Sequence, residues 1–376
     1  MRLPARRHAP LAARGLMAQS RDPRAWLIGG LLVAGCSLGS VAISAFIGEA
    51  LLRYQTTPIS VVAVAILLGM LVTYFFPALA GRGAPALAFC TTAVLQTGIV
   101  LLGLRLSLGS ASGVALQALP IVIACITMAI VTVSMCARYL AVERPLAILL
   151  AVGTSICGVT AVVATAPLLQ ARERDVSYAT ACIALYGLTA VIVYPTLAQL
   201  LFAGSALPVG LFLGTSIHDT AQVVGAAMAY DQLHAGDPAI EIATVTKLVR
   251  NLFMVILIPL AAMLAAASRP AGGGGALARP RVPPFVLAFG VMCAARTMLD
   301  MTGGSMDPDI ASRVDSLVAG AATLSGYCLL AAMAAVGLRT RLVELTQVGW
   351  QPLVLALLTA LAVGCTSIAA IRFLYL

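Results

Sequence analysis

The sequence predicts an all-α polytopic membrane protein with about eleven transmembrane helices, two of them interrupted near their centres. Of the 376 residues, 61% are hydrophobic and only 10% are charged, and the mean hydropathy is +1.02. A soluble globular domain carries about 25% charged residues. Apolar runs recur along the chain at lengths that let a helix cross a hydrocarbon core of about 30 Å, because each helical residue rises about 1.5 Å. We therefore expect one bundle of membrane helices rather than several soluble domains.

A basic tail, residues 1–24, precedes a single transmembrane domain, residues 25–376. The first apolar segment is too long for the core of a typical signal peptide, and no clear small-x-small cleavage site follows it, so we expect a retained anchor. Residues 268–282 contain four consecutive glycines and nearby prolines, which predict a flexible cytoplasmic loop. We place the apolar segments near residues 25–47, 58–77, 86–104, 118–137, 146–169, 178–203, 208–230, 239–267, 283–300, 316–337 and 351–373.

The placement of arginines predicts the orientation of the bundle. Six arginines lie in the tail, and the connections expected on the same side carry Arg82, Arg138, Arg144 and the arginines of the 268–282 loop. Loops rich in Lys and Arg stay in the cytoplasm. We expect a multi-pass protein of the bacterial inner membrane, with its N-terminus in the cytoplasm and its C-terminus outside. Either interrupted segment could instead be a re-entrant hairpin, but the arginines of the 268–282 loop favour full crossings.

Two apolar segments contain the same polar tetrapeptide near their centres. Gly153-Thr154-Ser155-Ile156 lies within residues 145–169, and Gly214-Thr215-Ser216-Ile217 lies within residues 208–230. Paired, interrupted membrane segments are the best sequence indication of a transporter's substrate site. A second echo, Gly-Leu-Arg at residues 103–105 and 337–339, falls on opposite predicted faces, as an inverted repeat requires. The two interrupted segments, however, come out parallel, which a simple inverted repeat does not predict.

A helix break exposes backbone groups near the middle of the membrane, where they are tolerated only against protein or a water-filled cavity. The N-terminus of the second half-helix then presents free N–H groups and a partial positive charge, which suit an anion. In the alternative interpretation, the polar residues are helix caps with only a local role. The residues that we expect at a substrate site on the two breaks are Thr154, Ser155, Cys157, Gly158, Thr215, Ser216, His218, Asp219 and Gln222.

Two cations lie in the eighth apolar segment: Lys247, about 14 Å down the predicted helix from Pro238, and Arg250, which follows at i+3 on the same face. Cations inside a membrane are costly and usually functional, with a partner nearby. We expect Asp219 to pair with one of them and the other to be available for an anionic substrate. The alternative is a purely structural ion pair that locks two helices together. His218 is either a proton-coupling group or a core histidine.

The sequence resembles the YeiH-like sulfate exporter family at residues 153–158 (GTSICG), 214–223 (GTSIHDTAQV), 245–250 (VTKLVR), 284–289 (PFVLAF) and 331–338 (AAMAAVGL). The resemblance runs in order from about residue 60 to the C-terminus. It implies a relation to the cation:proton antiporter and anion transporter group, with inverted repeats, crossed broken helices, a scaffold part and a mobile transport part. The chain departs from the family pattern at Val159-Thr160, where smaller residues such as Ala-Ser are expected, and this difference would alter the pocket.

These observations favour a secondary transporter that exports a small inorganic or organosulfur anion such as sulfate or sulfite, coupled to H⁺ or Na⁺. The alternative is a cation:proton antiporter that uses Asp219 as its ion-binding carboxylate; the surplus of cations over Asp219 favours an anion. We expect no enzyme, because the chain has no Gly-x-Ser-Gly pattern, no Asp-Asp pair and no histidine cluster. The nine cysteines form no Cys-x-x-Cys pair, so no metal or cofactor is expected. The expected partners are the anion, the lipid bilayer and a second copy of the chain in a homodimer, but no nucleic acid.

The predicted orientation can be tested with a reporter that is active only in the cytoplasm. The reporter should be active when it is fused before Met1 and silent when it is fused after Leu376, because an odd number of crossings puts the two ends on opposite sides. An active C-terminal fusion would overturn the eleven-helix count.

Overall fold

The computed structural model describes residues 22–46, 61–202, 205–234, 238–266, 284–303, 308–340 and 349–375, and every regular element in these ranges is helical. Eight helices of the described residues are long and apolar enough to cross a membrane, and four shorter apolar helices accompany them. This confirms the predicted all-α polytopic fold. Most of the basic tail (residues 1–21) and the 268–282 loop lie outside the described residues, as does Leu376.

The N-terminal part of the chain contains the first four expected apolar segments, some of them divided into pieces. Asp22 caps the first helix, where its Oδ1 accepts a hydrogen bond from Arg24 N at 2.9 Å. The third expected segment is continuous but contains a π-helical turn that the sequence pattern did not predict. The elements are α2 (Pro23–Ala45), α3 (Val61–Phe75), α4 (Pro77–Arg82), α5 (Ala84–Phe89), η2 (Cys90–Val94), α6 (Leu95–Leu102), η3 (Gly103–Arg105) and α7 (Leu108–Tyr139).

Both predicted interruptions are present in the middle of the chain. The first separates α8 from α9, and the second separates α11 from α12. A further interruption at Phe253 separates α13 from α14 and was not predicted. The remaining elements are α8 (Arg144–Ser155), α9 (Val159–Leu169), α10 (Glu173–Phe202), α11 (Ala206–Ser216), α12 (Thr220–Leu233), α13 (Ala239–Leu252), α14 (Met254–Ala266), α15 (Pro284–Gly303), α16 (Pro308–Arg339) and α18 (Trp350–Tyr375).

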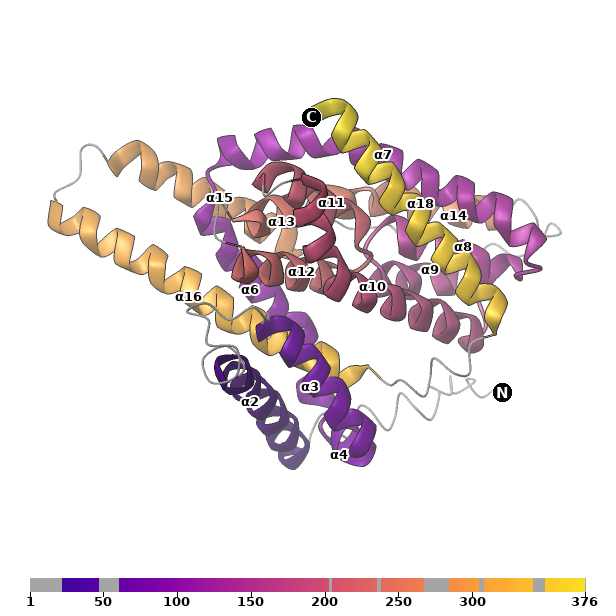
Figure 1. Ribbon diagram of the computed structural model, residues 1–376, viewed down its shortest axis with the longest axis horizontal. Helices are drawn as coiled ribbons and strands as arrows, with labels where there is room; N and C mark the ends of the chain where they lie inside the picture. The colour runs from indigo at the N-terminus through magenta and orange to yellow at the C-terminus, as the bar shows by residue number, and fades with distance from the viewer. Residues whose placement is uncertain are drawn as a thin grey trace, which may run out of the picture.

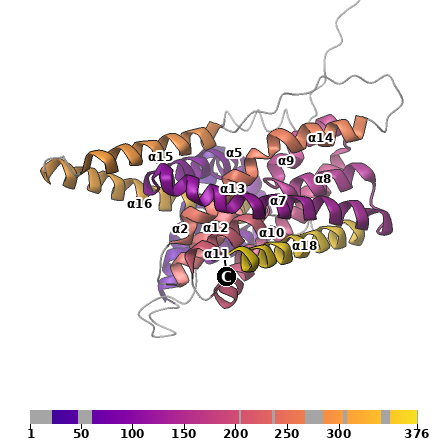
Figure 2. The same cartoon turned by 90° about the horizontal axis from the view of Figure 1, so that it is seen from above.

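The second interrupted helix, α11 and α12, lies in the interior of the bundle. Helix α11 packs against α7, α10, α12, α13 and α18, and α12 packs against α3, α10, α13 and α16 (Figure 1). At one end of the molecule α15 and α16 project as a long pair, and at the other end α14 lies with α8 and α9 (Figures 1 and 2). The polar residues of the breaks are therefore held away from the perimeter of the bundle.

Two glycines of the Gly-Leu-Arg echo lie at close contacts between helices. A Cβ on Gly337 of α16 would overlap the carbonyl oxygen of Ile66 on α3, and a Cβ on Gly103 would lie 2.8 Å from the carbonyl oxygen of Phe289 on α15. Beside the first contact, Thr73 Oγ1 donates to the Leu338 carbonyl at 2.7 Å. Small residues let membrane helices approach closely enough for such contacts. The echo thus has a packing role, while the inverted repeat itself stays a prediction.

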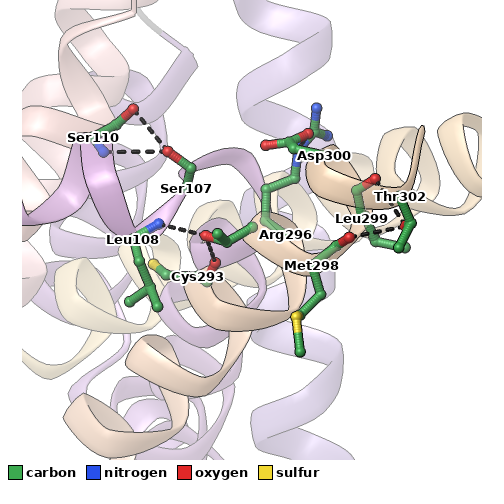
Figure 3. Close-up of polar contacts among 10 residues, drawn as sticks. Ser107, Leu108, Ser110, Cys293, Arg296, Met298, Leu299, Asp300 and Thr302 are labelled. Carbon is green, nitrogen blue, oxygen red and sulfur yellow. Dashed lines mark hydrogen bonds and ion pairs between the residues drawn. The ribbon is translucent and has the colours of Figure 1, made fainter. Parts of the chain in front are cut away.

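Helix α15 is linked to the start of α7 by a hydrogen bond from a backbone N–H of α7 to a side-chain hydroxyl of α15 (Figure 3). Leu108 N donates to Thr297 Oγ1 at 2.7 Å, and this hydroxyl donates to the Cys293 carbonyl at 2.9 Å. Ser107 caps α7, because its Oγ accepts from Ser110 N at 3.2 Å. One threonine therefore satisfies a free N–H group at the start of α7 while it links the two helices.

The contact between α3 and α16 can be tested with alanine at two glycines of the same helix. Gly337→Ala should lower the midpoint of thermal unfolding in detergent, because its Cβ overlaps the α3 backbone and overpacking costs roughly 1–3 kcal/mol. Gly320→Ala is the control: no atom lies within 4 Å of its Cβ, and alanine favours the helix by roughly 1 kcal/mol. Equal midpoints for the two variants would contradict the close contact.

Candidate functional site

The two helix breaks lie directly against each other. We call residues 156–158 and 217–219 together the paired break. Gly158 has φ +74°, a value that favours glycine, and a Cβ at this position would lie 3.0 Å from Asp219 Oδ2 and 3.1 Å from Asp219 Cβ. Glycine is therefore required both by the backbone conformation of the first break and by the second break that packs on it.

Arg250 on α13 binds the carbonyl ends of both first half-helices. The last carbonyls of a helix have no partner within it, and hydrocarbon offers none. Arg250 Nε donates to the Ser155 carbonyl at 3.0 Å, and Nη2 donates to the Thr154 carbonyl, both at the end of α8. Its Nη1 donates to the carbonyls of Thr215 at 2.8 Å and Ile217 at 3.0 Å, at the end of α11. The side chain is 1% exposed, so one buried guanidinium joins the two helices.

Lys247, one turn earlier on α13, binds backbone carbonyls within the two breaks. Its Nζ donates to the carbonyls of Ile156 at 3.0 Å, Ile217 at 3.0 Å and His218 at 2.5 Å. These bonds use the three donors of the ammonium group, which is fully buried. The partial negative charge at the two helix C-termini therefore lies against two side-chain cations, which is the favourable sign for a helix dipole.

Asp219 lies at the opposite ends, where α9 and α12 begin. Its Oδ1 accepts from Ala221 N at 2.9 Å, and its own N–H donates to Gln222 Oε1 at 3.2 Å, which together make a capping box for α12. The carboxylate also faces Gly158 and interacts with the backbone N–H of Val159, the first residue of α9. One carboxylate thus serves the positive ends of both second half-helices.

The expected ion pair between Asp219 and Lys247 or Arg250 is not formed. Within the described part of the chain, neither cation has a carboxylate oxygen within 4.0 Å. The reason is that the helix ends compete for the same charges: the cations bind the carbonyl ends and the carboxylate binds the N–H ends. The hydrogen bonds of both cations go to backbone carbonyls, and the availability of one of them to a substrate stays a prediction.

The predicted threonines and Gln222 serve the framework of the paired break. Thr154 and Thr215 contribute their carbonyls to Arg250. The Thr215 hydroxyl turns away, donating to Leu211 O at 2.7 Å and lying 2.7 Å from Ser367 Oγ on α18. Gln222 packs on Gly187 of α10, where a Cβ would overlap its side chain. Cys157 is a buried free thiol in the first break. Helix capping and helix packing therefore account for several of the residues that the sequence pattern predicted for a substrate site.

Other polar atoms around the paired break have no hydrogen-bond partner. Three belong to predicted residues, namely Ser155 Oγ, Ser216 Oγ and His218 Nδ1, all at most 3% exposed. Sequence reasoning missed three more on α13, which are Thr244 Oγ1, Thr246 Oγ1 and Asn251 Oδ1. Buried polar groups normally have partners, so these atoms give the paired break spare capacity for a polar ligand. The signal that could have found them is the run of polar residues around Lys247 and Arg250 on one helix.

Helix α11 approaches α13 closely enough for Lys247 and Arg250 to reach both breaks. A Cβ on Gly210 would lie 3.0 Å from the Ala239 carbonyl oxygen, and one on Gly214 would lie 2.8 Å from that of Ala243. This is the small-xxx-small pattern of closely packed membrane helices. The glycine of the second tetrapeptide therefore sets the distance between two helices rather than contacting a ligand.

A second polar cluster holds the start of α13. Glu241 Oε1 accepts from Arg105 Nε at 2.8 Å, and the Asp231 carboxylate accepts from Ala239 N at 2.8 Å and Ile240 N at 3.1 Å. Arg105 and Asp231 also line a cavity of about 200 Å³ between α12, α13 and α16. Sequence reasoning gave Glu241 and Asp231 no role, because their partners come from distant helices. Among the described residues, no three His, Cys, Asp or Glu side chains gather closely enough to hold a metal ion.

The bonds of Arg250 predict a large effect of its removal on stability. Arg250→Met should lower the free energy of unfolding by several kcal/mol, because each buried acceptor left without a partner costs about 1–3 kcal/mol. Thermal unfolding in detergent should show the loss, and Arg250→Lys should recover part of it. Arg313→Met, at an exposed position of α16, is the control and should change little. An unchanged unfolding midpoint in Arg250→Met would contradict the structural role of the guanidinium.

Comparison with known proteins places the chain in a family. The family model described as conserved hypothetical protein 698 matches residues 31–356. A UPF0324 membrane protein of Streptococcus pyogenes serotype M6 is 33% identical over 308 residues, covering 81% of this chain and 87% of the relative. UPF0324 membrane proteins of Fusobacterium nucleatum and Streptococcus pneumoniae R6 are 29% and 31% identical, covering 76% and 81% of this chain and 83% and 87% of the relatives. No solved structure matches. The chain therefore belongs to the membrane protein family described as conserved hypothetical protein 698.

Proposed function

We propose that this membrane protein is a secondary transporter that exports a small inorganic or organosulfur anion such as sulfate or sulfite. The observation that carries the proposal is the position of Asp219, whose carboxylate serves the N-termini of both α9 and α12. Such helix ends bind anions through free N–H groups and the helix dipole. The side-chain carboxylate occupies the place that a substrate anion would take.

The charge of the paired break also supports an anion. Lys247 and Arg250 together with Asp219 give a formal charge of +1, and the two pairs of helix ends contribute partial charges of opposite sign that cancel. When Asp219 is protonated or turns away, the formal charge at the N–H ends becomes more positive. The Ser155 and Ser216 hydroxyls, which lack partners, are suitable donors to the oxygens of a sulfate or sulfite ion.

In this proposal, the position of Asp219 also couples anion transport to proton binding. A substrate anion must displace the Asp219 carboxylate from the N–H groups, and uptake of a proton by Asp219 would permit this, so anion and proton binding are linked. Coupling to Na⁺ instead is the second form of the proposal. The preference for sulfur oxyanions rests on the resemblance to the YeiH-like sulfate exporter family. The inner-membrane location, the cytoplasmic N-terminus and assembly as a homodimer are parts of the same proposal.

A cation:proton antiporter is the second candidate, because Asp219 is the carboxylate of the paired break. A bound cation would need several oxygen ligands around it. The carbonyls of Ile156, Ile217 and His218 are the nearest backbone candidates, but each accepts a hydrogen bond from Lys247. These three carbonyls already accept hydrogen bonds from a cation, and the positive charges of Lys247 and Arg250 lie beside them, which favours the anion.

Asp219→Asn separates the two candidates. In the anion transporter, removal of the negative charge leaves the N–H ends unopposed, so labelled sulfate or sulfite should bind the purified variant as tightly as wild type or more tightly. Counterflow in proteoliposomes should then lose its pH dependence. In the antiporter, the same change removes the ion-binding carboxylate, and stabilisation by Na⁺ should disappear.

The matched control is Asp315→Asn, which removes an exposed carboxylate of α16. It should behave as wild type in both assays. The anion proposal fails if wild type binds none of a panel of labelled oxyanions while Na⁺ raises its unfolding midpoint and loses that effect in Asp219→Asn.

A further inference from the structure

A cavity of about 540 Å³ lies between α7, α8 and α14, beside the paired break. The residues of α8 that line it recur every three or four positions from Arg144 to Ser155, so the cavity follows one face of this helix along its whole length. At about 1.5 Å per residue this face is roughly 16 Å long. We call this cavity the α8 groove.

The walls of the α8 groove are apolar and its polar groups lie near the ends. Arg138 at the end of α7 and Arg144 at the start of α8 lie at one end, with Ser134 one turn below Arg138. Ser155, whose buried hydroxyl has no partner, lies at the other end. The apolar walls are formed mainly by Val133, Ala137, Ala147, Ile148, Ala151 and Leu257.

This distribution of polarity is unsuited to a hydrated inorganic ion. An oxyanion that moved along these walls would lose its water without gaining hydrogen bonds, at a high cost in free energy. An anionic headgroup with an alkyl chain matches the groove better, because its charge meets the arginines and its chain meets the apolar walls. The length of about 16 Å is close to half of a hydrocarbon core of about 30 Å, which is the depth of one leaflet.

We propose that the α8 groove binds an anionic phospholipid, with its phosphate at Arg138 and Arg144 and one acyl chain along α8 towards Ser155. Arginine is well suited to phosphate, because its planar guanidinium offers two parallel N–H donors. Basic pockets between membrane helices on the cytoplasmic side are typical sites for anionic headgroups. The arginine distribution predicts that these two residues face the cytoplasm. The two arginines that define this lipid site are not part of the proposed substrate site, although the two sites meet at Ser155.

The lipid acts on the paired break through α8. The last turn of this helix borders both the groove and the paired break: Ser155 is among the residues that line the groove, and its carbonyl binds Arg250 Nε at 3.0 Å. A ligand that binds one arrangement of a helix stabilises that arrangement. Lipid in the groove therefore favours the position of α8 in which the carbonyls of Thr154 and Ser155 bind Arg250.

A tryptophan reporter in the groove tests the proposal on the full chain. The two native tryptophans are replaced in Trp26→Phe/Trp350→Phe, and Leu260→Trp places a single indole at the groove wall. The protein is reconstituted in phosphatidylcholine vesicles with increasing fractions of brominated phosphatidylglycerol or brominated phosphatidylcholine. Brominated chains quench a tryptophan that they contact. Phosphatidylglycerol should reach half-maximal quenching at a mole fraction at least fivefold lower, because each basic side chain near an anionic headgroup contributes about a fivefold preference.

Charge variants identify the headgroup contact. Arg138→Gln/Arg144→Gln should remove most of the preference for phosphatidylglycerol. Arg82→Gln/Arg313→Gln removes the same amount of charge at exposed positions outside the groove. This control variant should keep the preference for phosphatidylglycerol. Should the first double variant fail to fold, Ala151→Phe tests the same site, because it fills the groove without changing charge and should weaken quenching by phosphatidylglycerol.

Three outcomes would overturn the lipid site. Equal quenching by the two brominated lipids would mean that the indole contacts the general lipid shell around the protein and that no headgroup is recognised. Relief of phosphatidylglycerol quenching by millimolar octanesulfonate that is also transported would assign the groove to the substrate. A preference that survives Arg138→Gln/Arg144→Gln but disappears in Ser155→Ala would put the anion at the deep end, contrary to the proposed orientation.

Discussion

The structure depends on how the free ends of two interrupted helices are satisfied inside a membrane. Each break leaves carbonyls at the end of one half-helix and N–H groups at the start of the next without hydrogen-bond partners. Lipid cannot supply a partner to either kind of group. Helix α13 supplies Lys247 and Arg250 to the carbonyl ends, and Asp219 serves the N–H ends. Each charge has the sign that the neighbouring helix dipole favours. Three ionisable side chains can therefore lie close together in the bundle interior without pairing with one another.

The glycines near the breaks follow from the same requirement. Lys247 and Arg250 reach both breaks only because α11 lies very close to α13, and Gly210 and Gly214 permit that distance. Asp219 faces both N-termini only because Gly158 has no side chain and adopts positive φ. The repeated tetrapeptide is thus mainly a structural signal. In the proposed transporter, the functional groups are the backbone atoms that it exposes and the hydroxyls beside them.

Sequence reasoning located the helices and both interruptions, because hydropathy and polar residues within apolar runs are local signals. It also placed Lys247, Arg250 and Asp219 together, since charges inside a membrane need compensation. It assigned the wrong partners to them, because it counted side-chain charges and left out the backbone carbonyls of Thr154, Thr215 and Ile217 as acceptors. It missed the interruption at Phe253 and the roles of Asp231 and Glu241, because the first has no polar signature and the others depend on contacts between distant helices.

The bonds of the two cations also limit how the protein can move. Arg250 binds the ends of α8 and α11 at once, and Lys247 binds both breaks, so any motion that separates the two interrupted helices must break several buried hydrogen bonds. Such a separation is costly in a medium without competing donors. Motion of α8, α9, α11, α12 and α13 as one body would keep these bonds, and one outer contact of that body is apolar, between Gly225 of α12 and Met333 of α16. In the proposed transporter, an alternating-access cycle would therefore move the paired break intact, and the α8 groove would lie where this body meets α7 and α14.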